Sequence, residues 1–213
     1  MCQSARMARS SDGVDVVRRQ QVHDAAIAEF SRRGFAATSM ADIAAAAGVS
    51  RPALYQYFRN KADVFASAFS ALLEDAVDRS LAALGRPDDP TTIVDRLDGF
   101  LQRFEGDLFE RLRSSPFAQE LLDAKYEHAA DASARALARR HRALVAHLRA
   151  LDADRARRDA WVDLLELGPS GLKQDAPTVA RHRRRLRALA TSVAADIERS
   201  STRLAVCTSP TTT

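Results

Sequence analysis

Apolar residues recur at intervals of three and four along most of the chain, which is the spacing of one face of an α-helix. Strand signals are nearly absent, because β-branched residues are scattered and Ala, Leu, Arg and Glu dominate. The pattern therefore predicts an all-α protein. The first predicted helix covers about residues 15–33, and residues 1–14 before it are expected to form a disordered arm.

Two short helices are predicted directly after the first one. Ser39 can accept a hydrogen bond from the amide of Asp42, while the Asp42 carboxylate accepts one from the amide of Ser39. This reciprocal cap predicts a helix start. Gly48 can take the positive φ that ends this helix, and Ser50 can cap the next one, over residues 51–58.

Longer helices are predicted over the rest of the chain. Residues 60–63 form another capped start and should open a helix that reaches about residue 84. Further helices are expected over about residues 91–113, 117–151, 154–167 and 178–200, with a break at residues 168–171 and a disordered tail over 201–213. The predicted domains are a helix-turn-helix DNA-binding domain over residues 15–60 and a helical ligand-binding and dimerisation domain over residues 61–200.

Positive charge is concentrated at the start of the chain. The net charge is +4, and the first 61 residues hold nine Lys or Arg against five Asp or Glu, whereas the remainder is balanced. Such a bias fits a polyanionic partner such as DNA. No apolar run approaches the roughly 18 to 20 residues that span a bilayer, and the first residues lack the apolar core of a signal peptide. The sequence therefore predicts a cytoplasmic protein without a membrane partner.

A helix, a tight turn and a short second helix in the most basic part of the chain are the parts of a helix-turn-helix DNA reader. Leu54 and Phe58 should face the core, which leaves Gln56 on the opposite, exposed face. Phosphate contacts need cations, hydroxyls and free amides at helix N-termini. The candidate DNA-binding residues are Thr38, Ser39, Ser50, Arg51, Pro52, Ala53, Tyr55, Gln56, Tyr57 and Lys61.

These candidates divide into base readers and phosphate contacts. Arg51 suits guanine and Gln56 suits adenine, while Pro52 and Ala53 suit apolar contact with a base. The phenols of Tyr55 and Tyr57 are long and rigid, so they are expected to donate to phosphate oxygens. The alternative is that the tyrosines are core aromatics and Ser50 is only a helix cap.

The segment IAEFSRRGFAATSMADIAAAAGVSRPALYQYFRNKADVF resembles the DNA-binding region of TetR-family transcriptional regulators over about residues 22–69. The matching motifs are Phe30, Gly34-Phe35, Thr38, Ile43-Ala44, Ala47-Gly48-Val49-Ser50, Leu54-Tyr55, Tyr57-Phe58 and Asn60-Lys61. The resemblance implies a three-helix reading head and a second domain whose ligand releases the protein from a palindromic operator. It also implies DNA contacts by Thr38, Ser39, Arg51, Pro52, Ala53, Tyr55, Tyr57 and Lys61. Ala53 departs from the small hydroxyl residue often found there.

A homodimer is expected on independent grounds, because one short helix reads few base pairs and two-fold pairing doubles the site. Apolar stripes on the last two predicted helices suit a four-helix interface. The candidate dimerisation residues are Trp161, Leu164, Leu165, Leu186, Leu189, Val193 and Ile197. The alternative is that both stripes pack inside one monomer.

The second domain gives no specific ligand signal. Six aromatic residues suit a pocket between helices or, equally, a packed core: Phe100, Phe104, Phe109, Phe117, Tyr126 and Trp161. The inducer and its binding residues stay unknown, and no cofactor is predicted. No metal site is predicted either, because His141 and His147 fall on different helical faces and are expected to be solvated. The Arg-rich run at residues 181–185 is a candidate for a second DNA contact, but helical spacing spreads its charges around the axis, which favours a solvated face or salt bridges near the interface.

The predicted function is that of a sequence-specific transcriptional regulator, a dimeric repressor that a small molecule releases from its operator. The alternatives among DNA-binding proteins are a regulator without a ligand and an architectural protein. An enzyme that uses the helical cavity is the alternative from a different class. Against it, the chain has no Gly-rich phosphate loop after a strand, no GxSxG and no HExxH motif.

Overall fold

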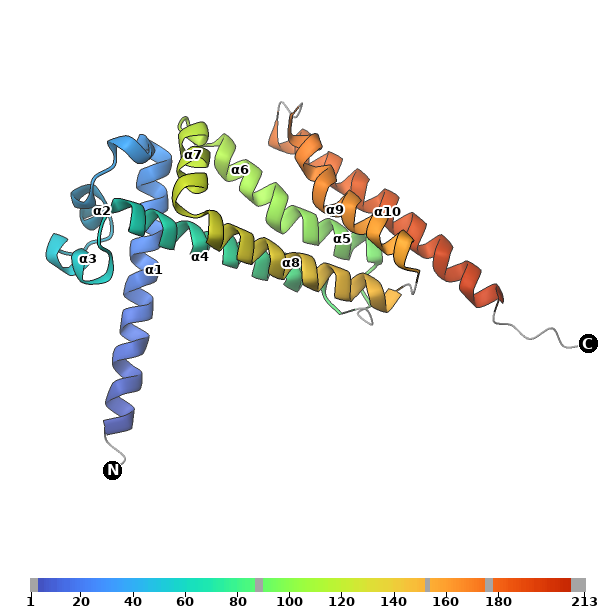
Figure 1. The fold of residues 1–213 in the computed structure, drawn as a ribbon, viewed down its shortest axis with the longest axis horizontal. Helices are drawn as coiled ribbons and strands as arrows, with labels where there is room; N and C mark the ends of the chain where they lie inside the picture. The colour runs from blue at the N-terminus through green and yellow to red at the C-terminus, as the bar shows by residue number, and fades with distance from the viewer. Residues whose placement is uncertain (1–3, 87–89, 152–153, 175–177, 208–213) are drawn as a thin grey trace, which may run out of the picture. The chain divides into compact units, whose positions relative to one another are not determined.

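The computed structural model describes residues 4–86, 90–151, 154–174 and 178–207, with side chains described between residues 15 and 200. Every element in these ranges is helical (Figure 1), which confirms the all-α prediction. The elements are α1 (Ser4–Ala37), α2 (Met40–Ala46), α3 (Arg51–Tyr57), α4 (Lys61–Leu84), α5 (Ile93–Leu101), the π-helical turn η1 (Gln102–Gly106), α6 (Asp107–Arg113), α7 (Ala118–His128), α8 (Ala130–Leu151), α9 (Arg155–Gln174) and α10 (Val179–Cys207).

The chain forms two compact units. Unit 1 comprises residues 1–73 and 114–134, and unit 2 comprises residues 74–113 and 135–213. The sequence predicted a boundary after residue 60 instead, with residues 114–134 in the second domain. The difference arises because α7 packs against α1: the Ser115 hydroxyl donates to the Ser31 carbonyl at 2.8 Å, and the Ala36 amide donates to the Glu120 carboxylate. A purely local pattern cannot reveal such a distant partner.

Unit 1 has an aromatic core that α1, α2, α3, α4 and α7 share. Phe30 of α1 meets Phe65 of α4 edge to face, with ring centroids 5.2 Å apart. Leu54 and Phe58 are buried, as the sequence predicted. Because these two side chains are buried, the opposite face of α3 is exposed.

The predicted caps around the two short helices are confirmed. The Ser39 amide donates to Asp42 Oδ2 at 2.9 Å, and the Asp42 amide donates to Ser39 Oγ at 3.2 Å. Gly48 has a φ of 65°, and Ser50 Oγ accepts from the amide of Ala53 at 3.2 Å. The turn chemistry therefore fixes where α2 ends and where α3 begins.

Unit 2 packs α5, α9 and α10 around a second apolar core, and Figure 1 shows α9 and α10 side by side. Leu97, Leu165 and Leu186 from these three helices are completely buried. Ion pairs join α10 to α5 at the surface: Arg187 of α10 lies 2.8 Å from Asp95 and 2.9 Å from Asp98.

Several predicted helix boundaries differ from the structure. Helix α1 begins at Ser4, where an arm was expected up to residue 14; residues 4–14 contain no proline that would end a helix. One predicted helix over residues 117–151 is divided at Ala129, whose backbone is not helical. Helix α10 extends to Cys207, beyond the expected end at residue 200. The remaining ends of the predicted arm and tail, residues 1–3 and 208–213, lie outside the described residues.

The predicted break at residues 168–171 is wrong, because α9 continues through Pro169. A proline inside a helix removes one backbone hydrogen bond and costs about 3 kcal/mol. Pro169 is itself buried, and Leu172 beyond it packs against the core of unit 2. Burial of these apolar groups offsets the cost, which a reading of local signals cannot anticipate.

Gly34 interrupts α1 with a φ of 82°. A Cβ at this position would meet the Glu120 carboxylate and approach the Phe117 ring to 2.9 Å. We expect Gly34→Ala to destabilise the protein by about 2 kcal/mol, because both the backbone conformation and the contact with α7 resist a side chain. Gly171→Ala is the matched control: it lies inside α9 with no atom within 4 Å of a new Cβ, and should stabilise by up to about 1 kcal/mol. Urea unfolding compares the two, and equal stabilities would contradict this account.

Candidate DNA-binding surface

Helix α3 presents a row of exposed side chains on the face opposite Leu54. Arg51, Pro52, Tyr55 and Gln56 are all exposed. The Arg51 guanidinium lies over the Tyr55 ring, 5.7 Å from its centroid. Pro52 stands in the first turn, where a backbone amide has no partner inside the helix. The structure therefore brings together a cation, an amide, an aromatic ring and a rigid apolar surface, which are groups that read base edges in a major groove.

The exposed ends of α2 and α3 add hydroxyl groups on the same unit. Ser39 and Ser50 are both exposed, but each is engaged as a helix cap. The Ser39 hydroxyl also donates to Asp42 Oδ2 at 2.6 Å. Hydrogen bonds from Ser39, with a smaller contribution from Arg33, lower the pKa of the Asp42 carboxyl to about 2. Asp42 is therefore ionised at neutral pH and holds the start of α2 in place.

Thr38 does not present its hydroxyl to solvent as the sequence analysis expected. It is buried, and its hydroxyl donates to the Gly34 carbonyl at 2.6 Å. The side chain thus stabilises the end of α1, where a carbonyl would otherwise lack a partner. In this conformation the hydroxyl proton is used by the Gly34 carbonyl, and the phosphate contact of Thr38 stays a prediction.

Lys61 also closes the end of α1. Its Nζ donates to the carbonyls of Phe35 at 2.7 Å and Ala36 at 2.9 Å, and it lies 4.7 Å from the centroid of the Phe35 ring. An ammonium group has three protons. One proton remains for a phosphate oxygen, so the predicted role is compatible with the structural one.

The Tyr57 phenol is already engaged with an acidic partner on α1. It donates to Asp15 Oδ1 at 2.8 Å, and the Arg19 guanidinium lies 5.7 Å from the centroid of its ring. A phosphate oxygen would have to replace the Asp15 carboxylate. The Asp15 carboxylate therefore occupies the position that a phosphate oxygen would take if the Tyr57 phenol bound DNA.

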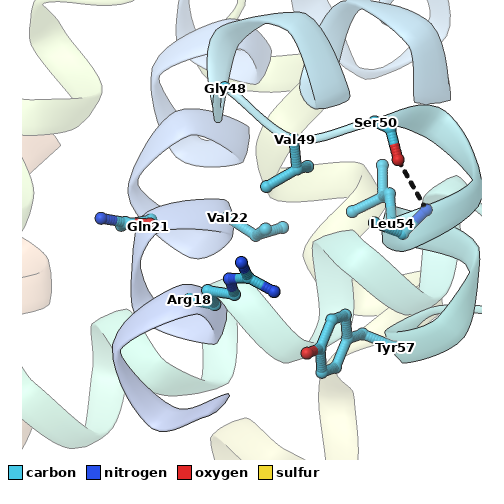
Figure 2. Close-up of a pocket in the computed structure, with 9 residues that line it drawn as sticks. Arg18, Gln21, Val22, Gly48, Val49, Ser50, Leu54 and Tyr57 are labelled. Carbon is cyan, nitrogen blue, oxygen red and sulfur yellow. Dashed lines mark hydrogen bonds between the residues drawn. The ribbon is translucent and has the colours of Figure 1, made fainter. Parts of the chain in front are cut away.

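A groove of about 390 Å³ lies between α1 and α3 (Figure 2). Its lining residues are Arg18, Gln21, Val22, Gly48, Val49, Ser50, Ala53, Leu54 and Tyr57. Figure 2 shows the Arg18 guanidinium and the Tyr57 phenol directed into the groove from opposite sides. Arg18 and Gln21 were not among the predicted site residues, although their spacing of three places them on one face of a helix in the basic segment.

Most of the predicted dimerisation residues pack inside the monomer. Trp161, Leu165, Leu186, Val193 and Ile197 are buried in unit 2, and the Trp161 indole donates to Asp196 at 2.9 Å. These five side chains are already covered by their own chain and are not free for a partner. Leu164 is 49% exposed, and Leu189 is half-buried beside Gly168.

The expected solvated histidines differ among themselves. His141 is exposed and lies 2.7 Å from Glu166, whereas His147 is buried. Burial, and to a lesser degree the charge of Arg96, lowers the pKa of His147. Within the part of the chain that the structure describes, no three His, Cys, Asp or Glu side chains are grouped so as to hold a metal ion.

Arg183, in the Arg-rich run near the start of α10, forms salt bridges, which was one of the roles predicted for this run. Arg183 lies 2.9 Å from Asp107 and 2.7 Å from Glu110. Such bonds to carboxylates raise the pKa of the Arg183 guanidinium. Over the described ranges, no helix is both long enough and apolar enough to cross a bilayer.

Comparisons with known proteins agree with this geometry. Residues 22–68 match the family model of bacterial regulatory proteins of the tetR family. The chain is 33% identical over 89 residues to the HTH-type transcriptional regulator AcrR of Shigella flexneri, covering 41% of each chain. It is 45% identical over 56 residues to the HTH-type transcriptional regulator TtgR of Pseudomonas putida, covering 26% of this chain and 27% of that one. The similarity thus spans less than half of the length of these relatives.

Solved structures extend the likeness beyond the matched segment. A TetR-like transcriptional regulator from Rhodococcus sp. RHA1 is 26% identical with a TM-score of 0.51, covering 82% of this chain and 93% of the other. The TetR-family regulator PfmR from Thermus thermophilus is 23% identical with a TM-score of 0.53, covering 82% and 97%.

The exposed second helix, the glycine turn and the capped starts define a helix-turn-helix protein with an additional helical unit. Residues 22–68 are similar to the bacterial regulatory proteins of the tetR family, and the fold of the described residues is similar to that of a solved TetR-like transcriptional regulator.

The Asp15–Tyr57 hydrogen bond predicts a gain of function. We expect Asp15→Ala to raise affinity for all duplex DNA about three- to tenfold, because it frees the phenol and removes a negative charge beside it. Asp24→Ala is the matched control, since Asp24 is an exposed acid on the same helix whose carboxylate accepts from Gln20. Fluorescence anisotropy with labelled duplexes measures both. Equal gains from the two variants would show that charge alone matters and that Tyr57 is not a phosphate contact.

Proposed function

We propose that the protein is a transcriptional repressor that binds a palindromic operator as a homodimer and is released by a small-molecule ligand. The observation that carries the proposal is the exposed row on α3, formed by Arg51, Pro52, Tyr55 and Gln56 opposite the buried Leu54. This row has the chemistry of direct base readout. The expected place of action is the cytoplasm, where bacterial chromosomal DNA is found.

The names of similar proteins support regulation as the activity. The matched proteins are described as transcriptional regulators, and one, SCO4008 of Streptomyces coelicolor, as a transcriptional repressor; it is 35% identical over 77 residues, covering 36% of this chain and 38% of that one. Their matched segments contain the reading head, so the repressor activity of the whole chain is our inference from the shared head and fold.

An exposed apolar pair on α9 supports the dimer. Leu164 and Leu167 are 49% and 69% exposed, and they lie three residues apart on one helical face. A large apolar side chain gains about 1.5 to 3 kcal/mol when it leaves water. We infer that these two leucines, with Leu189 on α10, form the centre of an interface between two copies of unit 2.

Selection of random duplex DNA by the purified protein tests the operator. We expect enrichment of a two-fold-symmetric motif. Arg51→Ala should lose the preference at one base pair of each half-site, a loss of about 1 to 3 kcal/mol in discrimination. Arg59→Ala is the matched control, because this side chain is 89% exposed but pairs with Asp63. No enrichment, or an unchanged motif with Arg51→Ala, would contradict the proposed reading head.

Light scattering at micromolar concentration tests the interface. We expect the wild-type protein to have the mass of a dimer and the double variant Leu164→Glu with Leu167→Glu to have the mass of a monomer, because buried carboxylates without partners oppose association. Leu137→Glu on α8 is the control, since Leu137 is also exposed, at 42%. A dimeric double variant would place the interface elsewhere, and a monomeric wild type would remove it.

A further inference from the structure

Unit 2 contains a buried guanidinium with an incomplete set of partners. Arg140 of α8 is only 3% exposed. Its guanidinium lies over the rings of Phe100 and Phe104, at 4.0 Å and 4.5 Å from their centroids. Its Nε is 3.5 Å from the Ser80 hydroxyl, at the limit of a hydrogen bond, and its Nη2 has no hydrogen-bond partner among the described residues. A buried cation in this state is costly unless something else completes it.

The carboxylates around Arg140 are engaged elsewhere. Glu105 is buried in the π-helical turn η1 and pairs with Lys173 Nζ at 2.5 Å. Glu166 lies 2.7 Å from His141. Both carboxylates act on Arg140 through space, but burial is the larger influence and lowers its pKa. One positive charge is therefore left without a dedicated counter-ion.

A second polar group with free hydrogen-bonding capacity belongs to the same cluster. His182 of α10 is completely buried, with its ring centroid 4.3 Å from that of Phe109. Neither of its ring nitrogens forms a hydrogen bond of normal geometry with a described residue. Burial and the charge of Lys173 lower its pKa, while Glu105 and the Leu172 carbonyl oppose this shift. His182 is thus a neutral imidazole whose N–H faces the Leu172 carbonyl, which leaves its other ring nitrogen as an acceptor without a partner among the described residues.

The π-helical turn η1 contributes both Phe104 and Glu105 to this cluster. Phe104, Glu105 and Gly106 are three consecutive buried residues, which the wider turn of η1 places toward the interior. Such π-helical turns occur often at functional sites. The cluster reaches solvent at Lys173, whose side chain is 35% exposed.

We propose that Arg140 is the anchor of an organic-anion site in unit 2, and that its ligand is a small monocarboxylate with an apolar body. The carboxylate would take the free nitrogen of Arg140. The rings of Phe100, Phe104 and Phe109 match an apolar body. A single uncompensated cation matches one negative charge better than the two of a phosphate monoester. This inference names the ligand class of the proposed repressor and rests on that proposed function.

The test uses the full-length protein and two pairs of probes: benzoate with benzamide, and octanoate with octanamide. Each pair has a similar apolar body and differs in charge. We expect at least one carboxylate, at up to about 10 mM, to raise the Tm and to give a calorimetric binding isotherm, while its amide and inorganic phosphate do neither. Equal binding of the amide, equal binding of phosphate, or no effect of either carboxylate would overturn the proposal.

Variants locate the site. Arg140→Gln should weaken carboxylate binding by about tenfold or more, and Arg140→Lys, which keeps the charge but loses the planar fork, should weaken it less. Arg142→Gln is the matched control, because Arg142 is exposed on the same helix. Unchanged binding by Arg140→Gln would overturn the assignment of the anchor. If Arg140→Gln fails to fold, the carboxylate affinity of Arg140→Lys and the comparison of each acid with its amide still test whether Arg140 binds the carboxylate.

The same preparation separates this inference from the proposed function. Operator selection without any probe measures DNA reading alone. A defined operator with no carboxylate binding would remove only the organic-anion site. Carboxylate binding without any operator would remove the proposed function and leave a helical binding protein. Release of a selected operator by the carboxylate, but not by its amide, supports both.

Discussion

The burial of Leu54 is the contact on which the reading surface depends. Helix α3 has only seven residues, and a helix of that length is not stable in water by itself. Leu54 is completely buried and Phe58 nearly so, in a core that Phe30 and Phe65 complete. This packing holds the helix at a fixed rotation about its axis, and the exposed row from Arg51 to Gln56 follows from it. Preorganisation of this kind avoids the cost of ordering the helix on DNA.

The capped starts of unit 1 were predictable because their signals are local. A serine three residues before an acidic or small residue, and a glycine at a helix end, specify hydrogen bonds within one turn of chain. Ser39, Gly48 and Ser50 all behave as predicted. Thr38 does not, because its hydroxyl bonds to the Gly34 carbonyl, a contact that depends on the irregular end of α1. The sequence shows that Thr38 has a hydroxyl near the candidate surface, but it does not show that this hydroxyl already donates to the Gly34 carbonyl.

The apolar stripes of α9 and α10 show a second limit of prediction from sequence. A stripe at helical spacing establishes that a face is buried, but it does not say whether the partner belongs to the same chain or to another copy. Trp161 and Leu186 proved to be core residues, and the exposed pair is Leu164 with Leu167. Leu167 was not among the predicted interface residues, and it lies at the predicted end of a helix that in the structure continues through Pro169.

Coupling between a ligand and DNA requires that the ligand bind one conformation better than another, and that this conformation read DNA differently. The cluster around Arg140 has the bonds for such a preference. The Ser80 hydroxyl donates to the Phe100 carbonyl at 2.7 Å and is also the weak partner of Arg140. In the proposed site, an anion that draws the guanidinium away would relax one bond on α4, the continuous helix that begins at Lys61, four residues after the end of α3. Lys61 in turn holds the end of α1 through two carbonyls. The proposed coupling would therefore act through bonds made by Ser80 and Lys61, two residues of this one helix.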